Sequence, residues 1–287
     1  MHDIFDTVTI QNTIIKTNTQ NGIGISNSAT ITNLNIVSSD MSSNGGHGLF
    51  LANARITNFH IDDSSFDGST TNGFCGIATG TTASTIGSFT MDGGSLSGNK
   101  GAGLAVVQAP SNFGSLTMDG VAIHGNQESG VMLGGGASAV SLTVKNSSFQ
   151  NNGWEDLDLS GGWFGAFSVT GDTTIANNCF RGGAWAAIWV GGAGSFTGDV
   201  DLTFNCFTTQ AWRVANENSK PINATNNWWG NATGPNPNQQ YGNVDDNPWL
   251  ATLNYSGDTL FTNTEDILLK ATLNNSDKSF STRRRYS

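Results

Sequence analysis

Apolar residues recur along the chain in pairs whose members stand five residues apart. The pairs are Ile10/Ile15, Ile36/Met41, Ile61/Phe66, Met91/Leu96, Met118/Ile123, Val144/Phe149, Ile175/Phe180 and Leu202/Phe207, with a degenerate ninth copy at Ala224/Trp229. Two residues before each pair stands another, mostly apolar residue: Val8, Leu34, Phe59, Phe89, Leu116, Leu142, Thr173, Val200 and Ile222. Alternation with a period of two is typical of a strand that buries one face. Each copy therefore predicts a short strand with an inward-facing apolar row.

A polar position and a further apolar position follow each pair at fixed spacing. Three residues after the pair come Asn18, Asn44, Asn99, Asn126 and Asn152, with Ser69, Gly183 and Gln210 in other copies. Five residues further on come Ile23, Leu49, Phe74, Leu104, Val131, Leu157 and Ile188. Stacked amides can each donate a hydrogen bond to the next copy, so these asparagines predict an asparagine ladder at a tight turn.

The distance between copies indicates the architecture. A mean period near 27 residues is too long for one hairpin and too short for a βαβ unit of about 30 residues or more. A single coil cannot bury its apolar residues alone, whereas coils stacked about 4.8 Å apart form continuous inner columns. We expect parallel β-helix coils over residues 1–230, a C-terminal closing segment over 231–254 and an irregular tail or linker over 255–287.

With these ladders, the sequence resembles the pectate-lyase-like superfamily of right-handed parallel β-helices. The run Asn226-Asn227-Trp228-Trp229-Gly230, followed by Gly234-Pro235 and Pro248-Trp249-Leu250, looks like the closing segment of bacterial extracellular β-helix repeat proteins. The expected fold class is therefore all-β, a single right-handed parallel β-helix (solenoid) of about nine coils. The resemblance also implies an extracellular or cell-surface location.

Composition and charge limit the kinds of structure and partner that the chain can have. The chain has 37 glycines, only 12% charged residues and five prolines, which disfavours both disorder and long helices. A net charge of -10 with 12 Lys and Arg residues leaves few contacts for a phosphate backbone, so we expect no nucleic acid partner. No stretch approaches the roughly 18 apolar residues of a membrane span. Three cysteines are too few for a disulfide scaffold. Cys179 and Cys206 share a register position and are compatible with either a disulfide or free thiols.

Acidic residues occupy one outward position of successive coils. Asp62, Asp92 and Asp119 are followed there by Lys145. Stacked carboxylates repel one another, so the row predicts either a hydrated acidic edge partly neutralised by Lys145 or a bound cation, for which Ca²⁺ is the natural candidate. No cofactor is required. The same four residues are the candidate catalytic set if the protein is a polysaccharide hydrolase or lyase.

The glycosidase members of the superfamily carry an Asp-Asp pair, then Gly-His-Gly, then Arg-x-Lys. This chain has Gly46-His47-Gly48 before Asp62-Asp63, the reverse order, and no Arg-x-Lys. The resemblance therefore does not extend to a catalytic role for His47.

Tryptophan is confined to the C-terminal half, where all eight residues lie from Trp154 onward. Trp154, Trp185 and Trp212 stand at the same spacing after their apolar pairs. Trp163 lies in a long return segment and Trp189 at an outward strand position. Exposed aromatic rings bind sugars or proteins, whereas rings stacked on one another stiffen a fold, and the sequence allows both.

These observations favour a non-catalytic secreted or cell-surface module. We expect it to act as a rigid stalk or adhesin that binds a glycan or a protein through its tryptophan-rich half. The alternatives are a polysaccharide hydrolase or lyase that uses the aspartate row, and a self-assembling filament subunit whose coils associate end to end.

Overall fold

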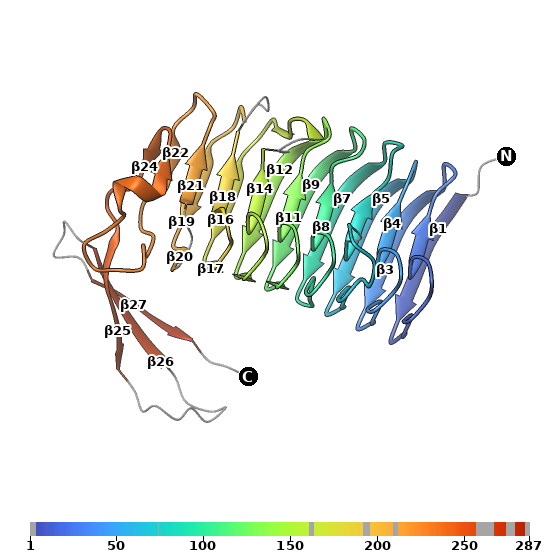
Figure 1. The fold of residues 1–287 in the computed structure, drawn as a ribbon, viewed down its shortest axis with the longest axis horizontal. Coiled ribbons are helices and arrows are strands. Elements are labelled where there is room, and N and C mark those ends of the chain that lie inside the picture. The colour runs from blue at the N-terminus through green and yellow to red at the C-terminus, as the bar shows by residue number, and fades with distance from the viewer. Residues whose placement is uncertain are drawn as a thin grey trace.

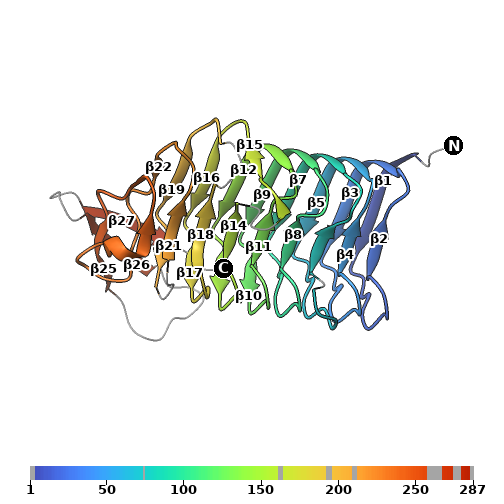
Figure 2. The same cartoon turned by 45° about the horizontal axis from the view of Figure 1, so that its top comes forward.

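The computed structural model describes residues 4–73, 75–160, 164–191, 196–208, 212–256, 267–273 and 279–284, with side chains described up to Leu250. The chain forms an all-β parallel solenoid of about eight turns with a period near 27 residues, which confirms the predicted fold class. Figures 1 and 2 show the coils stacked along the long axis from the N-terminus towards the C-terminal strands.

Three parallel sheets run along the solenoid. Sheet A contains β1 (Ile4–Gln11), β3 (Thr30–Val37), β5 (Arg55–Asp62), β7 (Thr85–Asp92), β9 (Asn112–Asp119), β12 (Ser138–Lys145), β15 (Ser168–Val169), β16 (Thr173–Ala176), β19 (Val200–Thr203), β22 (Ile222–Asn223) and β24 (Val244–Asp245). Sheet B contains β10 (Ala122–His124), β13 (Ser148–Gln150), β17 (Cys179–Arg181) and β20 (Cys206–Phe207). Sheet C contains β2 (Ile23–Ile25), β4 (Leu49–Leu51), β6 (Ile77–Thr79), β8 (Leu104–Val106), β11 (Val131–Leu133), β14 (Leu157–Leu159), β18 (Ala186–Val190), β21 (Trp212–Asn216) and β23 (Gln240–Tyr241). From β9 to β21 the chain passes through sheets A, B and C in that order, whereas in the four N-terminal coils isolated bridges at Ile14, Asp40, Ser65 and Ser95 take the place of sheet B.

The core consists of columns of side chains in register. Leu34, Phe59 and Phe89 lie opposite one another on β3, β5 and β7, and each is at most 2% exposed. Their neighbours along each strand point outwards, because successive residues of a strand face opposite sides. The apolar positions found by period therefore line the interior.

Aromatic rings continue one column to the C-terminal end. Phe149, Phe180, Phe207 and Trp229 are stacked with ring centroids 4.8, 5.3 and 4.9 Å apart and interplanar angles of 18°, 10° and 17°. This spacing follows the distance between adjacent strands, about 4.8 Å. All four residues are fully buried, so the last ring closes the end of the column.

Buried amides satisfy the backbone at the turn between sheets B and C. Nδ2 of Asn126 donates to Oδ1 of Asn152 at 3.0 Å, and Nδ2 of Asn99 donates to Oδ1 of Asn126 at 3.0 Å. In the next coil Gly183 stands at this position. Nδ2 of Asn152 instead donates to Oδ1 of Asp156 at 2.8 Å. A Cβ at Gly183 would lie 3.1 Å from this carboxylate, so the glycine leaves room for it.

A second row of amides lies at the turn between sheets A and B. Nδ2 of Asn178 donates to Oδ1 of Asn205 at 3.1 Å, and Oδ1 of Asn227 accepts from the backbone N–H of Asn205 at 2.7 Å. All three are buried. The sequence pattern did not predict this row.

Two coils depart from the expected spacing. Ile77, rather than Phe74, lies opposite Leu49 in sheet C, because this coil has three additional residues in the turn. Phe74 itself lies outside the described residues. In sheet C, Val214 lies opposite Ile188, because the turn before it is one residue shorter. The turns thus accommodate insertions and deletions, while the strands keep their pairing.

The C-terminal segments contain more strand than expected. In the predicted closing segment, β23 pairs with β21 and β24 pairs with β22, so two sheets continue beyond Gly230. A short 3₁₀ turn, Pro237–Gln239, precedes β23. Where an irregular tail was expected, β25 (Leu250–Ser256), β26 (Ile267–Leu273) and β27 (Ser279–Arg284) form an antiparallel sheet. Ile, Thr, Tyr and Phe in these runs are good strand formers.

Candidate functional site

Trp154 and Trp185 lie on adjacent coils at the turn between sheets B and C. The backbone N–H of Trp185 donates to the carbonyl of Trp154 at 3.2 Å, which holds the two residues side by side. Their side chains are 38% and 60% exposed. Among the described residues, neither ring contacts another aromatic ring. The two rings are therefore accessible to a ligand.

Trp212 extends this row, but in a different register from that predicted. Its backbone N–H donates to the carbonyl of Trp185 at 3.0 Å, yet it pairs with Ala186 in sheet C. The shortened turn places it two residues before the buried Val214, whereas Trp185 stands three before Ile188. Its ring packs edge to face on Tyr241, with centroids 6.2 Å apart. Tyr241 is 53% exposed and was not predicted as part of the site.

The remaining predicted tryptophans differ in their surroundings. Trp189 lies on β18 between Asp158 and Ala215 of the neighbouring strands and is half-buried. Its indole Nε1 is buried and has no hydrogen-bond partner in the described part of the chain. Trp163 lies outside the described residues. Trp154, Trp185, Trp212 and Trp189 together with Tyr241 are called the aromatic face below.

Carboxyl groups accompany the aromatic face. Oε2 of the buried Glu155 accepts from Oγ of Ser129 at 3.0 Å. Burial and the nearby Asp158 raise the pKa of Glu155, and burial raises the pKa of Glu128, whose carbonyl accepts from the N–H of Trp154. Glu155 is thus committed to the interior, whereas the half-buried carboxyl of Glu128 is suited to accepting hydrogen bonds from hydroxyl groups. Sequence reasoning missed these carboxyls, although Glu155 directly follows Trp154 in the chain.

The aspartate row is aligned as predicted, and two of its three carboxylates have separate partners. Asp62, Asp92 and Asp119 lie opposite one another, and Lys145 follows. Nε2 of His60 lies 3.3 Å from Oδ2 of Asp92, and Nζ of Lys145 lies 3.2 Å from Oδ2 of Asp119. No group of three or more His, Cys, Asp or Glu residues in the described ranges is arranged to hold a metal ion. The row thus carries its own partial charge compensation.

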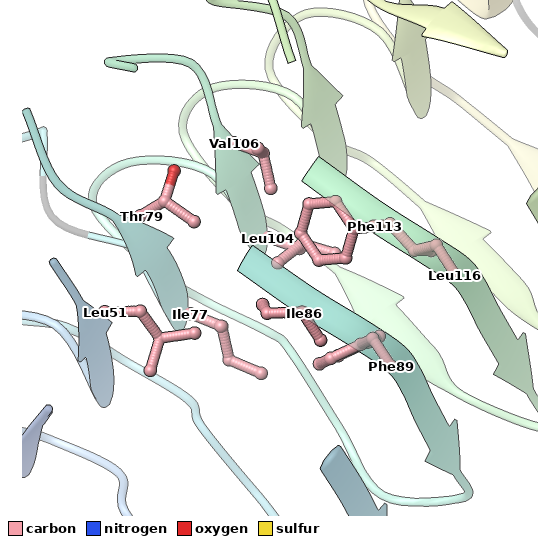
Figure 3. A pocket seen from close by; sticks show the side chains of 9 residues that line it. All are labelled: Leu51, Ile77, Thr79, Ile86, Phe89, Leu104, Val106, Phe113 and Leu116. Atoms are coloured by element: carbon pink, nitrogen blue, oxygen red, sulfur yellow. The ribbon is translucent and has the colours of Figure 1, made fainter. Parts of the chain in front are cut away.

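A small cavity of about 10 Å³ lies between sheets A and C, lined by described residues of both. Figure 3 shows Ile77, Ile86, Phe89 and Leu104 turned towards it, with Thr79 as the sole polar side chain in the lining. Such a volume holds about one water molecule. This cavity is a packing gap within the core and does not provide a ligand site.

His47 has a structural environment. It is 7% exposed, its Nδ1 accepts from the backbone N–H of Cys75 at 3.0 Å, and its ring stacks on Phe50 with centroids 5.3 Å apart. Burial lowers the pKa of His47 to about 4. The imidazole therefore stays neutral and anchors the turn at neutral pH.

His47 should make the solenoid sensitive to mild acid. Because its pKa in the folded protein lies below the ordinary value of 6.5, the unfolded chain binds the proton more readily, and stability falls as the pH drops from 6.5 to 4. In His47→Asn an amide oxygen replaces Nδ1 and cannot titrate. Between pH 7.5 and 4, we expect the free energy of unfolding of wild type to fall by about 2 kcal/mol more than that of His47→Asn. Urea unfolding at several pH values measures it. His60→Asn, which removes a half-exposed histidine, serves as the control, and an equal shift there would contradict this role of His47.

In the part of the chain that the structure describes, no helix has the length and apolar character needed to cross a membrane. Comparison with known protein families, curated proteins and solved structures finds no match to this chain.

Proposed function

We propose that the protein is a secreted or cell-surface β-helix module that binds a glycan through its aromatic face and performs no catalysis. The observation that carries the proposal is the pair of exposed rings, Trp154 and Trp185, held on adjacent coils with no aromatic partner among the described residues. Apolar sugar faces stack on such rings. The half-buried carboxyl of Glu128, next to Trp154 through its backbone, supplies an acceptor for sugar hydroxyls.

The proposal places the ligand on a rigid support. Successive coils are joined by strand pairing, buried amide rows and stacked rings, so the aromatic face is fixed by the core beneath it. A preorganised site loses little conformational entropy on binding. This supports the role of a stalk or adhesin, with the coils as the stalk and the C-terminal half as the binding part.

The extracellular location rests on the sequence. The NNWWG segment at 226–230, the Gly234-Pro235 pair and the Pro-Trp-Leu segment ending at Leu250 resemble the end of bacterial extracellular β-helix repeat proteins. The asparagine rows are likewise similar to those of the pectate-lyase-like superfamily, to which we propose a distant relation.

A glycan array tests the binding, with the full chain applied in the presence and absence of Ca²⁺. We expect Trp185→Ala to weaken binding about tenfold, since one stacked ring contributes about 1–1.5 kcal/mol. Trp154→Ala and Trp212→Ala should weaken it as well. Phe204→Ala removes a ring that is 49% exposed at the turn between sheets A and B, away from the aromatic face, and should leave binding unchanged.

The same array distinguishes the alternatives. Glycan binding that survives all three tryptophan substitutions would contradict the aromatic face as the site. Cleavage of a bound glycan that is abolished by Asp92→Ala would overturn the non-catalytic proposal in favour of a hydrolase or lyase that uses the aspartate row. Binding without Ca²⁺ dependence is expected, because the proposed contacts are rings and a protein carboxyl.

A further inference from the structure

Two cysteines lie side by side on the outer face of sheet B. Cys179 begins β17 and Cys206 begins β20, and they pair directly across the two strands. The next residues, Phe180 and Phe207, are buried and stacked at 5.3 Å, so the register of the two strands is fixed from inside. Both thiols are free and half-buried. Their alignment is therefore a stable property of the core.

The spacing allows the two sulfurs to bond, but not without strain. Adjacent strands lie about 4.8 Å apart, which is within the Cα separation that disulfides adopt. Directly opposed side chains in parallel strands keep nearly this spacing at Cβ, slightly more than the roughly 3.5–4.5 Å of a relaxed disulfide. Strained disulfides are more easily reduced. A bond between these cysteines would accordingly be reversible.

The two thiols are chemically unequal. Nε of Arg181 donates to Sγ of Cys179 at 3.2 Å. The hydrogen bond from Cys206 and then the adjacent Arg181 lower the pKa of Cys179 to about 6, against the effect of burial. The pKa of Cys206 is raised, chiefly by the hydrogen bond to Cys179 and by burial. The contact with Arg181 therefore favours the thiolate of Cys179 over that of Cys206.

The neighbouring side chains leave Arg181 as the positive group of the cluster. Ser148 lies opposite Cys179 on one side, Trp228 bridges to Cys206 on the other, and Gln150 lies opposite Arg181. His124, one coil further, bonds to Ser148 at 2.9 Å, and its pKa is lowered chiefly by burial. A small anionic molecule would meet a positive charge beside the thiolate.

We propose that Cys179 and Cys206 form a thiol–disulfide exchange site for small anionic disulfides such as glutathione disulfide, with Cys179 as the nucleophile and Cys206 as the resolving thiol. The Cys179 thiolate attacks one sulfur of the small disulfide, forms a mixed disulfide and releases one thiolate, which takes up a proton. Cys206 then loses its proton and attacks Sγ of Cys179, which releases the second thiol. Two electrons pass from the protein to the small disulfide.

Cys75 provides an internal standard for the test. It is 4% exposed, and burial raises the pKa of its thiol to about 12. Thiols with little thiolate and little access react slowly. Cys75 should thus stay unmodified in the folded protein whatever happens at sheet B.

The experiment exposes the reduced full chain to glutathione disulfide at pH 7, stops the reaction with acid and maps the cysteines by mass spectrometry. We expect wild type to acquire a Cys179–Cys206 disulfide and Cys206→Ser to stop at glutathione on Cys179. Cys179→Ser should react at least about tenfold more slowly at Cys206. Equal rates at Cys179 and Cys206 in the two variants, or a wild type that keeps glutathione on Cys179, would overturn the proposal.

A second variant separates the two roles of Arg181. Arg181→Gln should slow the reaction with glutathione disulfide severalfold at pH 7. With the neutral 2-hydroxyethyl disulfide the slowing should be smaller but still present, because only the stabilisation of the thiolate is then lost. An unchanged rate with both reagents would overturn the role of Arg181. Thermal unfolding of every variant shows whether the reactions are measured on folded protein. Cys75→Ser serves as the reference, because it removes a cysteine outside the proposed site.

Discussion

Phe180→Ala should lower the free energy of unfolding by about 4 kcal/mol, the typical loss for a phenylalanine truncated in a tight core. The ring is fully buried and lies between the rings of Phe149 and Phe207. Its loss removes the buried apolar area and both stacking contacts, and leaves a cavity that the rigid strand spacing prevents from closing. Urea unfolding followed by tryptophan fluorescence measures the change, since every tryptophan lies in the C-terminal half.

Phe164→Ala is the matched control for this substitution. Phe164 is 48% exposed, so its truncation should change stability by less than about 0.5 kcal/mol. If both variants lost the same stability, the stacked column would not be the source of the effect. Hydrogen exchange adds spatial detail, since coils of a solenoid contact only their neighbours and protection should fall first around β17.

Asn126→Ala should destabilise the solenoid by about 3 kcal/mol. Its Nδ2 donates to the carbonyl of Leu96 at 2.8 Å and to Oδ1 of Asn152 at 3.0 Å, and its Oδ1 accepts from the backbone N–H and the Nδ2 of Asn99, both at 3.0 Å. Alanine leaves these buried partners without hydrogen bonds, and each unpaired polar group costs free energy. Equilibrium urea unfolding checks the value.

Asn58→Ala tests whether burial is the reason. Nδ2 of Asn58 also donates to an asparagine of the adjacent coil, Oδ1 of Asn33 at 2.9 Å, but on the exposed surface of sheet A. Water replaces that bond, so the loss should stay near 0.5 kcal/mol or less. Similar losses for Asn126 and Asn58 would contradict the account of the buried row.

The inner columns could be predicted because they follow a strict spacing within each strand, whereas the turns could not. Ile77 takes the place expected for Phe74, since a strand selects its register by burial and the turn accommodates the additional residues. The second amide row was missed for a similar reason. In the same row, Oγ of Ser64 accepts from the N–H of Ser39, and Oδ1 of Asn178 accepts from that of Ser147. Serine and asparagine side chains thus serve equally as acceptors for a backbone N–H of the preceding coil.

The candidate site was predictable only as a set of residues. The spacing of Trp154 and Trp185 correctly placed them on adjacent coils, but the exposure of a ring depends on how the flanking turns fold. Trp212 shows the difficulty, since one residue fewer in its turn changes its partner to Ala186 and brings its ring onto Tyr241. Tyr241 lies 29 residues after Trp212 in the chain, and no local sequence pattern predicts their contact.

The strands of sheet A shorten along the axis, and this gives the molecule a mechanical polarity. The sheet A strands from β1 to β12 each span eight residues. Further along the axis β16 and β19 span four residues, and β22 and β24 span two. A load that pulls the coils apart along the axis is carried by each interface in series. The last interface has only two residue pairs between β22 and β24 and two between β21 and β23, so the solenoid would open first at its C-terminal coil.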